Sequence, residues 1–467
     1  MALRPFISVR LRRSLESAAN MQGKKLPRLV FFPVPLQGHM NPMLQLATLL
    51  HSKGFSITII HTHLNSPNPS NFPNFNFEPI PDGLSEIQTS TADSTTQFAI
   101  LNDTCRIPLS NCLSRLLSES DGSSIKCIIS DALFHCTHDV ATHLGLHMIV
   151  LRTNSPTAMG TIAAYKLLCQ KGYISVKEHH PDALVPEFPP LRVKDLPEFG
   201  STNPDELDRL TSAMRNATRA SSALLFNTLE CLEQTTLEKL RQDFHPLPIF
   251  AIGPLHKFSP GSSNSLLAQD QRCMAWLDKQ RPRSVVYVSF GSLASIKKAE
   301  LVEIAWGLAN SDQAFLWVIR PGSIDGLDWA EVAEDFEERT RDRGLIIKWA
   351  PQVEVLSHPS VGGFWTHNGW NSTLESICAG VPMICSPCLW DQMVNARYVS
   401  HVWRVGLQLE NGFRRDEIER TIRRLMGVTG TEDKRIRDLK ESAMRSMRKG
   451  GSSFEDLEAL VDLLLSF

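Results

Sequence analysis

The sequence predicts an α/β protein built from two doubly wound, Rossmann-like domains. Its 467 residues exceed what one ordinary hydrophobic core accommodates, and they suit two domains of roughly 200 residues each. In both halves, short apolar runs alternate with segments of helical periodicity, a pattern typical of parallel sheets covered by helices. A stretch rich in Gly, Pro and Ser, residues 253–269, separates the halves and is typical of a domain connection.

In the N-terminal half, the order strand, loop, helix, strand predicts a βαβ unit at the start of a parallel sheet. Residues 29–34 form the first apolar run, residues 43–52 follow with helical periodicity, and residues 55–61 are rich in Ile and Thr. Later in this half we expect strands at residues 127–130, 147–151, 223–227 and 249–252, helices at residues 95–117, 154–169 and 229–241, and an irregular surface loop at residues 181–198.

Two polar residues stand at the carboxyl ends of predicted strands in this half. His39 lies in the loop after the first strand, and Asp131 directly follows residues 127–130. The carboxyl ends of parallel strands meet at one edge of the sheet, where ligands of such folds bind. A His–carboxylate pair can act in proton transfer, so both residues are candidates for chemistry. A lone histidine is more often structural, and that alternative stays open for His39 on the residues alone.

The C-terminal half repeats the alternation. A helix at residues 271–279 precedes an apolar strand at residues 284–290, and Gly291-Ser292 then forms a turn before a second helix. Residues 454–465 carry apolar side chains at helical spacing and predict a final amphipathic helix. Further strands are expected at residues 314–319, 345–348, 361–366, 381–385 and 405–409.

The segment from Trp349 to Gln392 is the most informative part of the chain. Its predicted strand leads through a polar turn into a predicted helix at residues 371–379, whose first N–H groups are a natural site for a diphosphate. Ser372 and Glu375 also fit a capping box, and this structural alternative stays open for them. Asp391 and Gln392 combine several acceptors with a donor pair, as sugar-hydroxyl binders do.

This segment closely resembles the donor-binding signature of plant secondary-product UDP-glycosyltransferases. The resemblance implies the GT-B architecture, in which two Rossmann-like domains face each other across a cleft. It implies UDP-glucose as co-substrate, with Gln392 associated with glucose rather than galactose, and no further cofactor. The donor-binding residues that it implies are Ser292, Trp349, Ala350, Gln352, His367, Trp370, Asn371, Ser372, Glu375, Asp391 and Gln392.

The same resemblance assigns catalytic roles in the N-terminal half. His39 matches the family's general base and Asp131 the aspartate that orients it, which implies inverting transfer to a hydroxyl group of a small lipophilic acceptor, with a nitrogen or a carboxyl group as alternatives. Acceptors of the related subfamily include terpenoids, phenolics, cytokinins and benzoxazinoids, and residues 181–198 are expected near the acceptor mouth. The alternative is a catalytically silent nucleotide-sugar-binding protein, which would be expected to lack His39 or Asp131. A dehydrogenase fits less well, because neither half has a G-x-G-x-x-G turn after its first strand.

The expected division of the chain follows from these patterns and the resemblance. Residues 1–26 are expected to be a disordered extension, although the basic residues 1–20 also resemble a weak organellar transit peptide. A start at Met21 is the simpler interpretation. The expected parts after the extension are an acceptor-binding domain at residues 27–252, a linker at 253–270, a UDP-sugar-binding domain at 271–452 and a helix at 453–467 that returns to the first domain.

Composition excludes several other classes of protein. The net charge of −2 argues against nucleic-acid binding, and no apolar run reaches the roughly 18 to 20 residues of a membrane span. The 10 cysteines have no disulfide framework, and Cys385-x-x-Cys388 lacks a second pair, so we expect reduced thiols and no zinc site. No Asp-x-Asp sequence occurs, and we expect no metal dependence. A cytoplasmic monomer is expected, with an organelle as the alternative location if residues 1–20 are a transit peptide.

Overall fold

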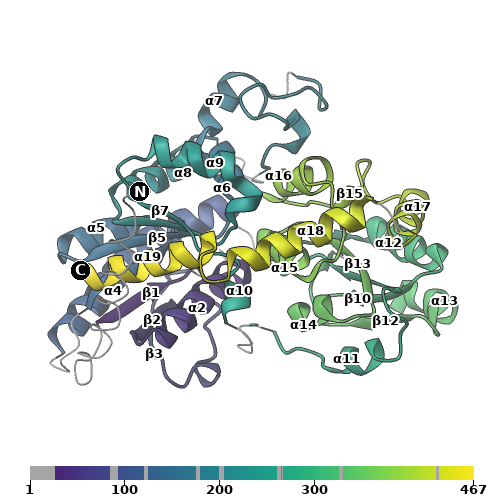
Figure 1. The fold of residues 1–467 in the computed structure, drawn as a ribbon, viewed down its shortest axis with the longest axis horizontal. Coiled ribbons are helices and arrows are strands. Elements are labelled where there is room, and N and C mark those ends of the chain that lie inside the picture. The colour runs from purple at the N-terminus through teal and green to yellow at the C-terminus, as the bar shows by residue number, and fades with distance from the viewer. Residues whose placement is uncertain are drawn as a thin grey trace, which may run out of the picture.

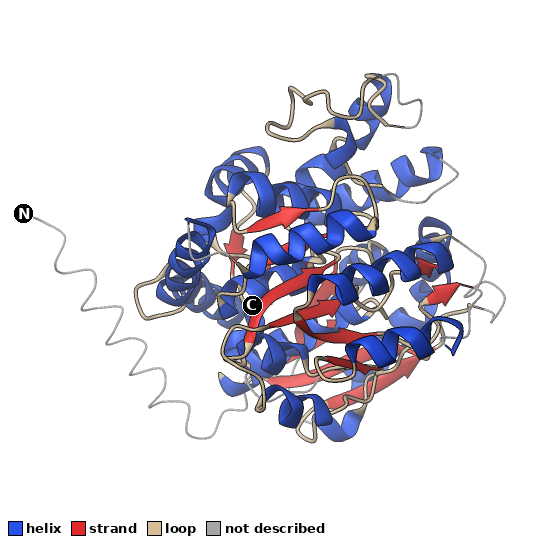
Figure 2. Ribbon diagram, turned by 90° about the vertical axis from the view of Figure 1, so that its right-hand side faces the viewer, coloured by secondary structure: helices blue, strands red, loops and turns tan. Residues whose placement is uncertain are grey.

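The computed structural model describes residues 27–84, 93–119, 125–174, 179–198, 204–259, 265, 267–325, 330–427 and 431–467. The predicted extension at residues 1–26 therefore lies outside the described residues. Two parallel sheets, each covered by helices on both faces, form the core of the molecule (Figures 1 and 2). The predicted fold class is confirmed.

The first sheet has seven parallel strands in the order β3-β2-β1-β4-β5-β6-β7. The strand order reverses between β1 and β4, so this gap is a topological switch point, where ligands of doubly wound sheets bind. The strands are β1 (Arg28–Phe32), β2 (Ser56–Thr62), β3 (Asn76–Ile80), β4 (Ile125–Asp131), β5 (His147–Arg152), β6 (Ala223–Phe226) and β7 (Ile249–Ala251).

The second sheet has six parallel strands in the order β12-β10-β8-β13-β14-β15. Its order reverses between β8 and β13, which gives a second switch point. The strands are β8 (Val285–Ser289), β10 (Ala314–Val318), β12 (Gly344–Ile347), β13 (Val361–Thr366), β14 (Met383–Cys385) and β15 (Gly406–Gln408), and a separate two-stranded sheet pairs β9 (Ile296–Lys297) with β11 (Ile324–Asp325).

Helices bury their apolar faces on both sides of each sheet. Hydrophobic clusters form between β1 and helix α2 on one face of the first sheet, and between β4 and helix α4 on the other. The helices up to residue 258 are α2 (Gln37–Ser52), α4 (Ser94–Ser118), α5 (Cys136–His143), α6 (Pro156–Ala163), α7 (Tyr165–Gln170), α8 (Pro204–Ala220), α9 (Glu230–Asp243) and α10 (Leu255–Phe258). The helices after residue 270 are α11 (Arg272–Leu277), α12 (Lys298–Ser311), α13 (Ala330–Thr340), α14 (Gln352–Ser357), α15 (Trp370–Ala379), α16 (Gln392–Arg397), α17 (Arg415–Met426), α18 (Thr431–Ser446) and α19 (Ser452–Ser466).

Helix α2 begins earlier than the sequence suggested. Its first residue is Gln37 rather than residue 43, so His39 lies in the first helical turn and not in a loop. Pro42 lies inside the helix, where it lacks the N–H that would bond to the carbonyl of Gly38 four residues earlier. The side-chain amide of Asn371, in the other sheet's domain, donates to that carbonyl instead. Pro42 is tolerated because another donor takes the place of its missing N–H.

The last helix returns to the first sheet. In Figure 1 the yellow helices α18 and α19 run across the molecule, with α18 beside the second sheet's helices and α19 beside the first sheet. Leu457, Leu460 and Leu464 of α19 are buried in one hydrophobic cluster with Leu29 and Phe31 of β1. No helix in the described ranges is long and apolar enough to span a membrane.

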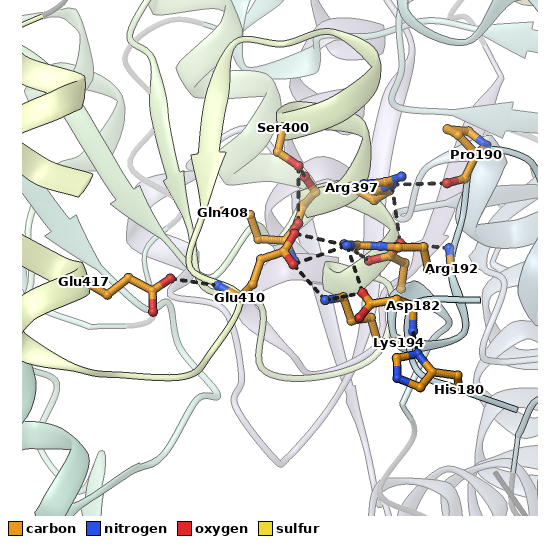
Figure 3. A network of polar contacts seen from close by, with 12 residues as sticks. His180, Asp182, Pro190, Arg192, Lys194, Arg397, Ser400, Gln408, Glu410 and Glu417 are labelled. Atoms are coloured by element: carbon orange, nitrogen blue, oxygen red, sulfur yellow. Dashed lines mark hydrogen bonds and ion pairs between the residues drawn. The ribbon is translucent and has the colours of Figure 1, made fainter. Parts of the chain in front are cut away.

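Residues 181–198 are irregular, as expected, with one short 3-10 helix at Val193–Asp195, but part of the segment is buried. Several of their apolar side chains, Leu191 and Leu196 among them, are buried in a small cluster with Val394 of α16. Arg192 donates from Nη1 to Glu410 Oε1 at 3.2 Å, and Lys194 Nζ lies 2.7 Å from Glu410 Oε2, as Figure 3 shows. The segment therefore packs against the second domain, where apolar burial and ion pairs hold it in place.

Candidate active site in the interdomain cavity

A cavity of about 610 Å³ lies between the two domains and is lined by residues of both. This volume suits a small-molecule ligand, since such sites usually measure roughly 300 to 1,000 Å³. Every site residue predicted from the sequence lies on its wall, namely His39, Asp131, Ser292, Trp349, Ala350, Gln352, His367, Trp370, Asn371, Ser372, Glu375, Asp391 and Gln392.

The first switch point brings His39 and Asp131 together. His39 follows β1 in the first turn of α2, and Asp131 is the last residue of the neighbouring strand β4. The Nδ1 atom of His39 lies 2.8 Å from Asp131 Oδ2, and Asp131 Oδ1 accepts a hydrogen bond of 2.9 Å from the backbone N–H of Leu133. The Asp131 side chain is 1% exposed and that of His39 is 17% exposed. The geometry commits Nδ1 to Asp131 and leaves Nε2 as the ring nitrogen for a ligand's proton.

The surroundings of His39 favour its protonated form. Burial lowers the pKa of His39, but the charge of Asp131 and its hydrogen bond raise it more, and the charge of Asp391 adds to them, so the pKa lies above its ordinary value. Thr153 Oγ1 lies 3.0 Å from His39 Nδ1 and holds the ring from the β5 side. The imidazole is thus fixed in place and prepared to carry a positive charge.

The second switch point places His367 and Ser292 on the opposite wall. His367 follows β13, and the next residue, Asn368, has a left-handed φ of 60°, which asparagine tolerates better than most residues. Gly291 and Gly369 both pack closely against the His367 ring. A Cβ atom at either position would lie within 2.6 Å of a ring atom, so there is no room for a larger residue. Burial lowers the pKa of His367 to about 4. This imidazole is therefore neutral at pH 7.

Helix α15 begins at Trp370 and points its N-terminus into the cavity. Its N-cap is Gly369, which makes no side-chain cap, so the first backbone N–H groups of the helix stay free for an anion. The capping-box alternative for Ser372 and Glu375 is wrong. Both side chains instead accept hydrogen bonds from Gln352 Nε2, at 2.9 Å and 2.7 Å. Burial raises the pKa of Glu375 to about 7, although the hydrogen bond from Gln352 lowers it.

Trp370 and Asn371, two of the residues predicted to bind the UDP-sugar, also form hydrogen bonds between the domains. Trp370 Nε1 donates to the backbone carbonyl of Asn227 at 2.7 Å, and Asn371 Oδ1 accepts from Asn227 Nδ2 at 3.2 Å. Asn371 Nδ2 bonds to Gly38 O at 2.7 Å. The polar atoms of both side chains are therefore used across the interface, and their backbone N–H groups are what α15 offers to a ligand.

Gln392 is oriented by the backbone next to it. Its Oε1 accepts hydrogen bonds from the N–H groups of Cys388 and Leu389, at 2.9 Å and 3.0 Å. These bonds occupy the oxygen end of the amide, so the Nε2 donor pair is the part of Gln392 that remains for a ligand. Asp391 Oδ2 accepts from Asn395 Nδ2 at 3.0 Å, and burial raises the pKa of Asp391.

Trp349 and Ala350 form the end of the cavity beyond β12. Trp349 is half-buried and its Nε1 donates to Ser265 Oγ at 2.7 Å, which fixes the plane of the indole ring. Ala350 is buried beside it. A fixed aromatic face next to small residues can stack on a flat heteroaromatic ring.

Sequence reasoning missed the contribution of the carboxyl end of β5 and the residues that follow it. Arg152, Thr153 and Asn154 all line the cavity, and Thr153 contacts His39. The rule that selected Asp131, a polar residue at the carboxyl end of a parallel strand, applies equally to them. Asn227, which follows β6 and bonds to Asn371, fits the same rule. Within the part of the chain that the structure describes, no group of His, Cys, Asp and Glu side chains could hold a metal ion.

Comparisons with known proteins agree with this geometry. Residues 71–427 match the sequence profile of the family described as UDP-glucoronosyl and UDP-glucosyl transferase. UDP-glycosyltransferase 76B1 of Arabidopsis thaliana is 48% identical over 94% of this chain and 98% of that protein. DIMBOA UDP-glucosyltransferase BX8 of Zea mays is 40% identical over 94% of this chain and 98% of that protein. The structure of Phytolacca americana UGT2 with UDP-2fluoro-glucose and pterostilbene is similar with a TM-score of 0.80 at 26% identity, covering 94% of this chain and 99% of that chain.

Proposed function

Because this chain belongs to the UDP-glucoronosyl and UDP-glucosyl transferase family and is a UDP-glycosyltransferase of small plant metabolites, we propose a specific reaction for it. Glucose is transferred from UDP-glucose to a hydroxyl group of a small lipophilic acceptor, with inversion at the anomeric carbon. The observation that carries this proposal is the 2.8 Å contact between His39 and Asp131 on the same cavity as the open N-terminus of α15.

His39 acts as the general base in this reaction. Its Nε2 removes the proton of the acceptor hydroxyl as that oxygen attacks the anomeric carbon. Asp131 holds the ring through Nδ1 and stabilises the imidazolium that forms, in keeping with its hydrogen bond to His39. General-base catalysis of this kind contributes about 10²–10⁴-fold, so positioning and charge stabilisation supply the rest.

The opposite wall receives the leaving UDP. As the bond from the anomeric carbon to the β-phosphate oxygen breaks, negative charge develops on the diphosphate. Hydrogen-bond donors for this charge are the free N–H groups of α15, the hydroxyls of Ser292 and Ser372, and the neutral His367. The N-terminus of α15 also contributes the positive end of its helix dipole. Glu375 would accept from ribose hydroxyls, and Trp349 would stack on the uracil ring.

Asp391 and Gln392 are proposed to bind the glucose hydroxyls. Both lie on the cavity wall near His39, and the charge of Asp391 acts on the His39 ring. The Nε2 group of Gln392 donates, since its oxygen is bound to the backbone. The acceptor then occupies the part of the cavity lined by α4, α8 and the segment after β5.

The alternative of a silent nucleotide-sugar-binding protein is disfavoured by the intact His39–Asp131 pair. The decisive experiment incubates the purified full-length chain with UDP-glucose and a panel of terpenoid, phenolic, cytokinin and benzoxazinoid aglycones. Mass spectrometry should detect glucosides of at least one class. Binding of UDP-glucose without any product over the whole panel would favour the alternative.

A further inference from the structure

Arg152 is a buried cation on the acceptor side of the cavity. It is the last residue of β5, only 5% exposed, and it lines the cavity. Its Nε has no hydrogen-bond partner, and its Nη2 donates to Thr218 Oγ1 at 3.4 Å, a long hydrogen bond. A guanidinium has five N–H donors in a fixed planar fork, so most of the binding capacity of Arg152 is unused within the protein.

Such a cation needs a negative partner. Across the described ranges, no carboxylate forms an ion pair with Arg152; Asp131 acts on it only through its charge. The oxygens of Asp131 are already bonded to His39 and to the N–H of Leu133. Burial lowers the pKa of Arg152 to about 10, so the side chain still carries its positive charge at pH 7. A buried charge without an ion-pair partner is costly, and a ligand anion would supply that partner.

A second donor without a partner lies two residues further along. Asn154 lines the same cavity, and its Nδ2 is buried without a hydrogen-bond partner. Thr153, between the two, contacts the His39 ring at 3.0 Å. Both unused donors therefore flank the residue that touches the proposed base. An apolar part of the wall of the same cavity is formed by Phe98, Leu207 and Leu210. This apolar surface suits the carbon skeleton of a small molecule.

We propose that Arg152, assisted by Asn154, binds the carboxylate of an acidic acceptor whose hydroxyl group, a few bonds away, is presented to His39. This inference rests on the proposed function and deepens it, because it names the acceptor class as small hydroxy acids. The planar fork of arginine matches a carboxylate in a bidentate arrangement. A site with buried donors discriminates strongly against an analogue that lacks the matching group, so neutral acceptors of the same shape react more slowly.

The test uses matched pairs of acceptors with the purified full-length chain and UDP-glucose. The 2-, 3- and 4-hydroxybenzoates are compared with the corresponding hydroxybenzamides, which have nearly the same shape and no charge. For at least one isomer, kcat/KM should favour the acid by about tenfold or more. Arg152→Met should reduce kcat/KM for that acid by about tenfold more than it reduces kcat/KM for the amide, and Arg152→Lys should restore part of the difference.

Two controls separate recognition from folding. Burying a charge without an ion-pair partner costs stability, so Arg152→Met, which removes that charge, should keep the Tm of the wild type or raise it. Arg397→Met serves as the matched arginine control, because Arg397 is paired with Asp195 and lies off the cavity wall. It should leave the ratio of acid to amide unchanged.

The outcomes distinguish this inference from the proposed function. Three results would overturn the inference while glucosyl transfer stands. The first is an equal kcat/KM for acid and amide, and the second is an acid preference that Arg152→Met does not change. The third is the formation of alkali-labile glucose esters in place of alkali-stable glycosides. Calorimetry with hydroxybenzoate in the presence of UDP provides the complementary measurement. If the wild type binds the acid, Arg152→Met does not, and no aglycone is glucosylated, the carboxylate site stands and the proposed function fails.

Discussion

Asn371 Nδ2 donates a hydrogen bond of 2.7 Å to the backbone carbonyl of Gly38, the residue before His39. This bond joins the second residue of α15 to the first turn of α2. Pro42 leaves the Gly38 carbonyl without its helical donor, so the interdomain bond meets no competition from within α2. The turn that carries His39 is therefore held directly against the helix whose N-terminus points into the cavity.

Replacing His39 with alanine should reduce turnover by about 10²-fold or more, because the proton acceptor is lost. The affinity for UDP should change little, since the residues proposed to bind UDP belong to the second domain and His39 belongs to the first. Steady-state kinetics and calorimetry with UDP measure the two effects. His143→Ala, which removes an exposed histidine at the end of α5, is the matched control. Near-normal turnover of His39→Ala with an alcohol acceptor would refute the mechanism.

The dependence of kcat/KM on pH should move when Asp131 loses its charge. His39 must be neutral to accept a proton, and its pKa lies above the ordinary 6.5, so wild-type activity should fall as the pH drops through a value above 6.5. In Asp131→Asn, burial still lowers the pKa of His39 but the charge that raises it is gone. The acidic limb should therefore move to lower pH, while the plateau activity also falls. A limb that stays in place would show that His39 does not control it.

Binding of UDP should release a proton through Glu375. Burial raises the pKa of this carboxyl group to about 7, so it is partly protonated at neutral pH in the free enzyme. Ribose hydroxyls that donate to the carboxylate would stabilise its charged form and lower its pKa. Calorimetry at pH 7 in two buffers of different ionisation enthalpy measures the release. Glu375→Gln should abolish it, and an unchanged proton release in that variant would exclude Glu375 as the source.

The donor preference should depend on the Nε2 group of Gln392. A buried polar group left unpaired costs about 1–3 kcal/mol, so UDP-glucose should exceed UDP-galactose in kcat/KM by roughly 5- to 150-fold. Gln392→Glu keeps an oxygen for the N–H groups of Cys388 and Leu389 but removes the donor, and should reduce this preference. Kinetics with each donor separately are needed because the products have equal mass. Equal kcat/KM of the wild type for both donors, or a preference for UDP-glucuronate, would contradict the assignment.

Activity should not require a divalent cation. The sequence lacks Asp-x-Asp, and the described residues contain no cluster of metal-binding side chains. Initial rates should be the same in EDTA as in added Mg²⁺ or Mn²⁺. Loss of activity on chelation that is reversed by added metal would count against the prediction.

The sequence predicted the positions of the cavity residues better than their bonding. Strand order follows from apolar runs and periodicity, so the meeting of His39 with Asp131 at a sheet edge could be inferred. The oxygen of Gln392 is bound to backbone N–H groups three and four residues earlier, and spacing does not reveal which end of an amide stays free. The sequence also did not reveal that Pro42 lies inside α2, because the donor that permits it belongs to Asn371 in the other domain.

The contact of α19 with β1 has a consequence for biosynthesis. The hydrophobic cluster that begins with Leu29 and Phe31 is completed by Leu457, Leu460 and Leu464, which are translated only after every strand of both sheets. At about 5 to 20 residues per second, translation of the intervening chain takes on the order of half a minute. During that time the apolar surface of β1 and α2 that α19 will cover is accessible to chaperones and to other nascent chains. This face of the first sheet is therefore completed only after the second sheet has been translated.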